Sequence, residues 1–197
     1  EAPDRRILTD ILRMGLPNAG SITVEVTSYT MMALLISRLG SVAAASHQIM
    51  SSMGALLYMV PLSLSIATSA RVSYWRGAGQ SDRARRAVRD GLTWIVLCAT
   101  LMCVLLALLR GPIARLYIND QEVAALATHL LIFMVWYHAA DAIQVFCFFI
   151  LRSHRVTVAP MLIYAVLLWG VGLTGGYTLT YIGLGDVAPM LNPQAFW

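Results

Sequence analysis

Two acidic residues interrupt long apolar stretches of this 197-residue chain, and they are the first candidates for chemistry. Glu25 is the one charged residue within positions 14–37, and Asp141 is the one charged residue within positions 123–151. A carboxylate at the centre of a bilayer costs about 2.5 to 3.5 kcal/mol on insertion scales, so acids in such places usually serve ions or substrates. The alternative is a structural acid that hydrogen-bonds a neighbouring helix.

Helical spacing places further polar side chains beside each acid, because residues three, four or seven positions apart share one face of a helix. We therefore expect two polar helix faces that point at a cavity. Their members are Asn18, Ser21 and Ser28 around Glu25, and Tyr137, His138 and Gln144 around Asp141.

Carboxylate, hydroxyl and amide oxygens suit two kinds of occupant. One is a hard monovalent cation such as Na⁺, which prefers oxygen ligands. The other is a proton shared between two carboxylates, since like charges close together cannot both stay ionised at low cost. His138 favours proton coupling weakly, because an imidazole titrates near neutral pH, but it is equally consistent with a hydrogen-bonding strut. Na⁺ and H⁺ both remain open.

The elements that carry these residues follow from composition. The chain is 58% hydrophobic and 12% charged, whereas soluble domains carry about 25% charge. A bilayer core needs roughly 20 apolar residues of helix, while barrel strands alternate over about 10. We predict an all-α, polytopic membrane helix bundle. Its five transmembrane helices span about 14–37, 45–70, 91–109, 124–150 and 159–182.

The positive charge of the chain comes from fourteen arginines, and their distribution predicts its orientation. Eleven lie on one side of the predicted spans and three on the other. Because cytoplasmic loops collect Arg and Lys, we expect a cytoplasmic N-terminus. We expect no nucleic-acid partner.

Enzymatic and metal chemistry find little support in the sequence. The three cysteines lack CxxC spacing and the four histidines form no HExxH array, so we expect no catalytic residue, no metal site and no cofactor besides a coupling ion. Gly172 and Gly176 have the GxxxG spacing of close helix contacts.

Several motifs of the chain resemble the multidrug and toxic compound extrusion (MATE) transporters, in their NorM-like branch. The segment 39–49 is similar to the LGxxAxAAHQI motif at the start of the eighth helix of that family, and the segments 61–67, 71–72, 77–79 and 84–85 match the end of that helix and the basic loop after it. The tenth and eleventh helices are matched by Tyr137, Asp141 and the segments 143–145, 150–152, 170–172 and 175–177. Ser153 and His154 stand where the family has a Gly-containing turn.

The resemblance implies a fold and a function. Residues 1–197 correspond to the C-terminal lobe, without the N-terminal lobe and the final helix. Glu25, Asp141 and Tyr137 fall on ion-coupling positions of the family, with His138, Gln144, Ser28 and Asn18 as candidate proton or substrate contacts. The expected function is secondary active efflux of amphipathic cationic drugs in exchange for Na⁺ or H⁺, in contact with membrane lipid and the missing lobe. The location that the resemblance implies is a bacterial inner membrane.

Two other functions remain open. Glu1 in place of Met, and an end at Trp197 where another helix could begin, lead us to expect a partial chain. A non-transporting lobe with a scaffold or dimerisation role is therefore one alternative. A related flippase of lipid-linked substrates is the other.

Overall fold

The computed structural model describes residues 5–117 and 120–178, and within them all regular structure is helical. In the described residues, five helices are long and apolar enough to cross a membrane, which confirms the predicted helix bundle. They are α1 (Arg5–Ser37), α2 (Ser41–Gly77), α3 (Ser81–Tyr117), α4 (Gln121–Ser153) and a last helix made of α5 (Val158–Tyr164), the π-helical η1 (Ala165–Leu173) and α6 (Thr174–Tyr177). Positions 179–182 of the last predicted span lie outside the described residues.

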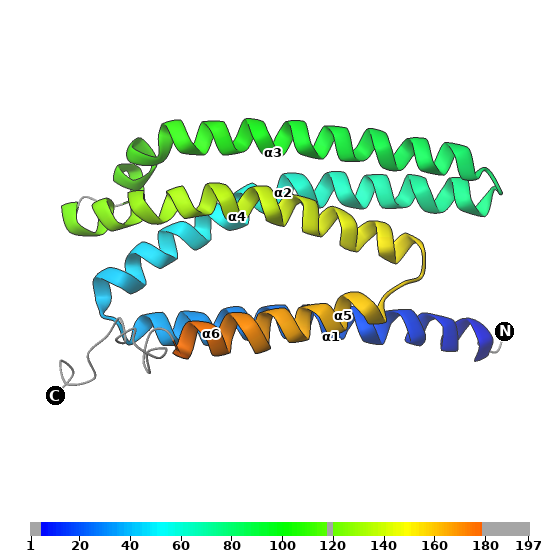
Figure 1. Cartoon of the computed structure of the whole chain (residues 1–197), viewed down its shortest axis with the longest axis horizontal. Helices are drawn as coiled ribbons and strands as arrows, with labels where there is room; N and C mark the ends of the chain where they lie inside the picture. Colours follow the sequence, from blue (N-terminus) through cyan, green and yellow to red (C-terminus); the bar gives the residue numbers. More distant parts are fainter. Residues whose placement is uncertain (1–4, 118–119, 179–197) are drawn as a thin grey trace. The chain divides into compact units, whose positions relative to one another are not determined.

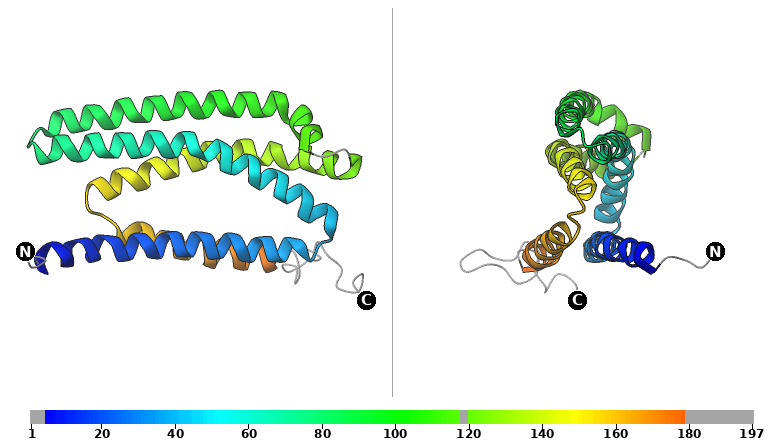
Figure 2. Two further views of the ribbon diagram at one scale, coloured as in Figure 1. Left: turned by 180° about the vertical axis from the view of Figure 1, so that it is seen from behind. Right: turned by 90° about the vertical axis from the view of Figure 1, so that its right-hand side faces the viewer.

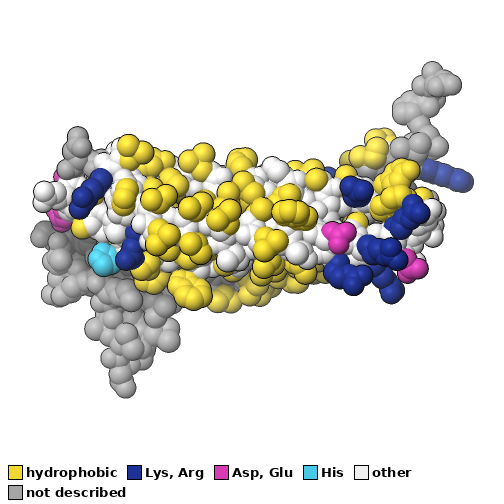
Figure 3. All heavy atoms as spheres, turned by 90° about the horizontal axis from the view of Figure 1, so that it is seen from above, with side chains coloured by type: hydrophobic (Ala, Val, Ile, Leu, Met, Phe, Trp, Pro, Cys, Tyr) yellow, Lys and Arg dark blue, Asp and Glu magenta, His cyan; other side chains and the backbone are white. Residues whose placement is uncertain are grey.

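An apolar surface on α3 shows why these helices suit a lipid solvent. Its most apolar window has a mean hydropathy of 2.6. Leu101 is 59% exposed and Leu108 73% exposed, which is costly in water and favourable in hydrocarbon. Figure 3 shows hydrophobic side chains along the middle of one face and arginines gathered near one end.

The chain divides into two compact units, which are described separately. One unit consists of residues 39–156 and holds α2, α3 and α4, packed against one another (Figure 1). Its core has two clusters, the first around Ile49, Leu106 and Leu131, the second around Ile95 and Phe146. Polar contacts join α2 and α4 near both ends. The Ser46 hydroxyl donates to the Val123 carbonyl at 3.2 Å, and Arg76 Nη1 donates to the Ser153 carbonyl at 2.8 Å.

The other unit pairs α1 with the last helix, and the two run side by side in Figure 2. A Cβ added to Gly20 would lie 2.8 Å from Met161 Sδ, so glycine permits a close approach there. The expected GxxxG contact is correct at one end only. A Cβ on Gly176 would meet Met32 Cε at 3.5 Å, whereas one on Gly172 would meet the Leu167 carbonyl of the same helix.

A proline accounts for the bend of α2 that is visible in Figure 1. Pro61 lies inside α2 and is buried. It has no amide N–H to donate to the carbonyl of residue 57, and its ring displaces that carbonyl, which bends a helix. The two halves of α2 therefore run in different directions.

The turns that end α2 and α4 have the same hydrogen-bond pattern. After α2, Gln80 donates to the Trp75 carbonyl at 2.9 Å and Gly79 donates to the Arg76 carbonyl at 3.1 Å, with a φ of 71° at Gly79. After α4 the residue with positive φ is Arg155, at 60°. A side chain disfavours this left-handed conformation, which glycine adopts freely.

Substitutions at these two turns should change stability in opposite directions. Gly79→Ala should lower, and Arg155→Gly should raise, the free energy of unfolding by about 1 kcal/mol, because only glycine avoids the left-handed penalty. Thermal unfolding of the detergent-solubilised protein, expressed from its complete reading frame, measures both. Loss of stability in Arg155→Gly would contradict the assigned turn.

A second prediction concerns the contact between α2 and α3. A Cβ on Gly91 would lie 2.5 Å from both Cγ2 and Oγ1 of Thr68 and 3.1 Å from its Cβ, so rotating this short side chain would not remove all of the close contacts. Gly91→Ala should therefore destabilise the protein by about 1 to 3 kcal/mol through overpacking. The matched control is Gly15→Ala in α1, where nothing lies within 4 Å. It should be neutral or stabilising by up to about 1 kcal/mol. Equal effects of both changes would contradict the close contact.

Candidate functional site

The acid of α1 lies on an exposed part of its helix surface. Glu25 is exposed, whereas the neighbouring Ser21 and Ser28 are 2% and 8% exposed. The Ser21 hydroxyl donates to the Pro17 carbonyl at 3.0 Å, so this buried group is satisfied within its own helix. The predicted polar face of α1 therefore varies in burial: the two hydroxyl groups are buried, and the carboxylate beside them is accessible.

The last helix holds the turn of α1 that carries Glu25. Trp169 Nε1, in the π-helical η1, donates to the Val24 carbonyl at 3.3 Å. The π-helix adds one residue to a turn and is frequent at functional sites. This bond ties the backbone next to Glu25 to a second helix.

The acid of α4 has two accessible polar neighbours. Asp141 is half-buried, Gln144 is exposed, and Tyr137 is 61% exposed. One helical turn separates Tyr137 from Asp141, and Gln144 follows three residues later, so their polar groups line one edge of α4. A carboxylate, a phenol and an amide there supply the oxygens that the sequence predicted.

His138 lies on the buried side of Asp141, whereas Tyr137 and Gln144 lie on its exposed side. It is 1% exposed and shares the buried face with Met134 and Ala142. In the described part of the chain, its Nε2 has no hydrogen-bond partner. The same holds for the Ser65 hydroxyl of α2, which is fully buried. Ser65 was not singled out from the sequence, although a serine one turn after Pro61 in an apolar run was a visible signal.

The two acids belong to different units of the structure. Glu25, with Asn18 and Ser28, is on α1 of one unit, and Asp141 is on α4 of the other. The convergence of the two carboxylates therefore stays a prediction. Among the described residues, no group of three His, Cys, Asp or Glu side chains is placed to hold a metal ion.

These features define a class of protein: a multi-pass helical membrane protein with a carboxylate inside two of its apolar helices. The MatE family model matches residues 17–178, and the chain therefore belongs to this family of transporters.

Individual relatives support the same family. The chain is 38% identical to the multidrug resistance protein MdtK of Photorhabdus laumondii and 39% identical to the probable multidrug resistance protein NorM of Aromatoleum aromaticum. Each match covers 100% of this chain and 42% of the relative, so the chain spans less than half the length of these proteins. A solved MOP superfamily transporter from Pyrococcus furiosus has a similar fold, with a TM-score of 0.78 at 16% identity over 88% of this chain and 39% of that one.

The surroundings of His138 predict how the protein tolerates its loss. His138→Leu should leave the free energy of unfolding unchanged to within about 1 kcal/mol, because an apolar side chain of similar size removes an unsatisfied polar atom. Met134→Ala, on the same buried face, should cost about 2 to 5 kcal/mol through the cavity it leaves. Thermal unfolding compares them, and an equally large loss in His138→Leu would show that the imidazole is a hydrogen-bonding strut.

Proposed function

We propose that this chain forms part of a secondary active multidrug efflux transporter, in which inward movement of Na⁺ or H⁺ drives export of amphipathic cations. The observation that carries the proposal is the presence of Glu25 and Asp141 inside helices apolar enough to cross a membrane. Acids at that depth are costly unless they serve an ion or substrate. Membership of the MatE family supports the same function.

In this mechanism the coupling ion and the drug compete for the same negative charge. Glu25 and Asp141 would bind the ion, with the Tyr137 phenol as a further ligand, and Gln144, Ser28 and Asn18 as candidate contacts to a proton or substrate. Neutralising the carboxylates removes the charge that attracts a cationic drug. A ligand shifts a conformational equilibrium by its differential affinity for the two states. Ion binding therefore favours the state that releases the drug.

His138 is an additional candidate in the proton-coupled version of this mechanism. Its burial and its Nε2 without a partner in the described residues separate it from the exposed edge of Tyr137 and Gln144. A role in proton transfer would require a path from Asp141, three residues away on the same helix. The alternative role is packing alone.

The proposal includes a location and an orientation. The five apolar helices of the described residues make the chain a multi-pass membrane protein, and we place it in a bacterial inner membrane with the start of α1 in the cytoplasm. The excess of arginines in the first turns of α1, on both sides of the turn that joins α2 to α3, and at the end of α4 supports this orientation.

The proposal applies to the protein that the complete reading frame encodes. The relatives are more than twice as long as this chain, since each match covers 42% of them. A second lobe of similar size is the expected partner, because transporters of this kind bind substrate between structural repeats.

Removing either acid's charge should abolish ion-driven export. Glu25→Gln and Asp141→Asn should each reduce efflux of a fluorescent lipophilic cation by about tenfold or more, since a charge-assisted interaction contributes about 1.5 to 3 kcal/mol. Matched controls are Glu122→Gln and Asp82→Asn, two exposed acids in the first turns of α4 and α3. These should export at the unaltered rate. Normal efflux by either acid variant would contradict its assignment.

Separately imposed gradients identify the coupling ion. Vesicles that contain the complete protein should export the fluorescent cation under an inward Na⁺ gradient or an inward H⁺ gradient. Export that responds to neither gradient would exclude antiport and would favour the scaffold or flippase alternative.

A further inference from the structure

A pocket of about 600 Å³ lies between the last turns of α2 and the first turns of α3. Its volume falls within the roughly 300 to 1,000 Å³ of ordinary ligand sites. Charged and aromatic residues dominate its lining. They are Arg71 and Trp75 of α2, and Arg83, Arg86, Asp90 and Trp94 of α3.

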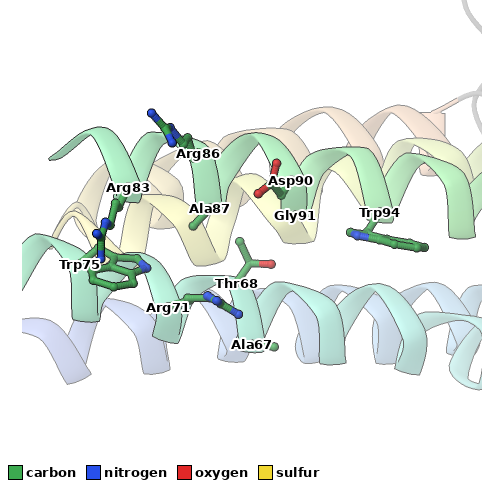
Figure 4. A pocket seen from close by; sticks show the side chains of 10 residues that line it. All are labelled: Ala67, Thr68, Arg71, Trp75, Arg83, Arg86, Ala87, Asp90, Gly91 and Trp94. Carbon is green, nitrogen blue, oxygen red and sulfur yellow. The ribbon is translucent and has the colours of Figure 1, made fainter. Parts of the chain in front are cut away.

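The tight turn between the two helices builds the outer end of this pocket. The turn at Gly79 brings the end of α2 beside the start of α3, so that the Arg83 guanidinium carbon lies 4.8 Å from the ring centroid of Trp75. A guanidinium over an indole is a favourable cation–π contact that leaves the N–H groups at the edge available as donors. In Figure 4, Thr68 of α2 and Ala87 of α3 lie between the two helices, Arg71 lies along α2, and Arg86 and Asp90 project from the side of α3 that faces away from α2.

The inner end of the pocket reaches the apolar part of the helices. Gly91 and Thr68 line it at the close contact between α3 and α2. Beyond Asp90, α3 has no charged residue until Arg110, and Trp94 in this stretch is 61% exposed. Tryptophan prefers the boundary between hydrocarbon and head groups. The pocket therefore spans that boundary, with arginines toward the polar side.

The charge of the pocket selects among ligands. Three arginines and one carboxylate leave an excess of positive charge, which disfavours the cationic drugs of the proposed function. Guanidinium groups bind phosphate oxygens through paired N–H donors. The exposed apolar surface of α3 continues from the pocket through Leu97 and Leu101, and it can cover a hydrocarbon chain. One ligand has both parts: a phosphate head and an acyl tail.

We propose that this pocket binds the phosphate head group of an anionic phospholipid, with Arg71 and Arg83 as its principal contacts. A general excess of arginines would orient the protein without any pocket. Here the arginines instead line a pocket that also includes Gly91 and the side chains of two tryptophans, Trp75 and Trp94, at the membrane boundary. Basic pockets between transmembrane helices are known sites for anionic lipids. The site is independent of Glu25 and Asp141 and of the transport proposal.

Native mass spectrometry of the complete protein, supplied with phosphatidylglycerol or phosphatidylcholine, tests the proposal. The unaltered protein should retain phosphatidylglycerol in preference to phosphatidylcholine. The double variant Arg71→Gln/Arg83→Gln should lose about 30-fold in affinity for phosphatidylglycerol, the combined effect expected of two arginines near a lipid surface. The matched control is Arg110→Gln/Arg115→Gln, which removes two arginines from the opposite end of α3 and should bind normally. Equal binding by the two double variants would overturn the proposal.

Two further arms keep the test decisive if the double variant does not fold. In the unaltered protein, a phosphatidylglycerol that carries a photoreactive group near its head should crosslink within residues 67–94. Crosslinking only elsewhere would overturn the site. Radiolabelled inorganic phosphate supplied alone should bind weakly and be displaced by phosphatidylglycerol. Tight phosphate binding that the lipid fails to displace would identify a soluble-anion site and overturn the lipid assignment.

Discussion

The absence of water in a bilayer core is the constraint on which this structure depends. Each backbone N–H and C=O in hydrocarbon must find a partner within the protein, and a helix supplies nearly all of them locally. Polar side chains follow the same constraint. The hydroxyls of Ser21 and Thr128 donate to carbonyls four residues earlier in their own helices, so they add no unsatisfied group. Hydroxyl-bearing residues are therefore compatible with spans that contain few charges.

Side chains whose polar groups cannot find a partner within their own helix are the ones that point to function. A carboxylate has no N–H or O–H to give to its own helix when ionised. Glu25 and Asp141 are therefore the residues that we propose bind an exchangeable cation. Two neutral buried groups have no partner in the described residues, the Ser65 hydroxyl and His138 Nε2. Ser65 lies one turn after Pro61, at the bend of α2, and His138 lies on the buried face of α4. They are secondary candidates because a neutral group costs far less to bury than a charge.

The number and class of the helices could be predicted because the length of uncharged runs is a direct consequence of bilayer thickness. The ends of the helices could not be predicted, because a helix continues beyond the hydrocarbon into water: α3 begins at Ser81, well before its apolar run.

The candidate site was predicted only in part. Consecutive residues are rotated by about 100° around a helix. The adjacent side chains of Tyr137 and His138 therefore differ in burial: Tyr137 is exposed and His138 is buried. The spacing of residues in the sequence predicts which side chains share a helix face, but the neighbouring helices determine which face is buried. The π-helical η1 lies in an apolar, glycine-containing segment with no periodic pattern, and nothing in that segment predicted it.

The central claim is that a drug and a coupling ion compete for Glu25 and Asp141. The most direct measurement adds a lipophilic cation to the purified complete protein in weak buffer and records ion release, with a pH indicator for H⁺ and with radiolabelled Na⁺. The account predicts that drug binding releases one of these ions, and that release disappears when both acids are changed to their amides. Saturable drug binding that releases neither H⁺ nor Na⁺ from the unaltered protein would contradict it.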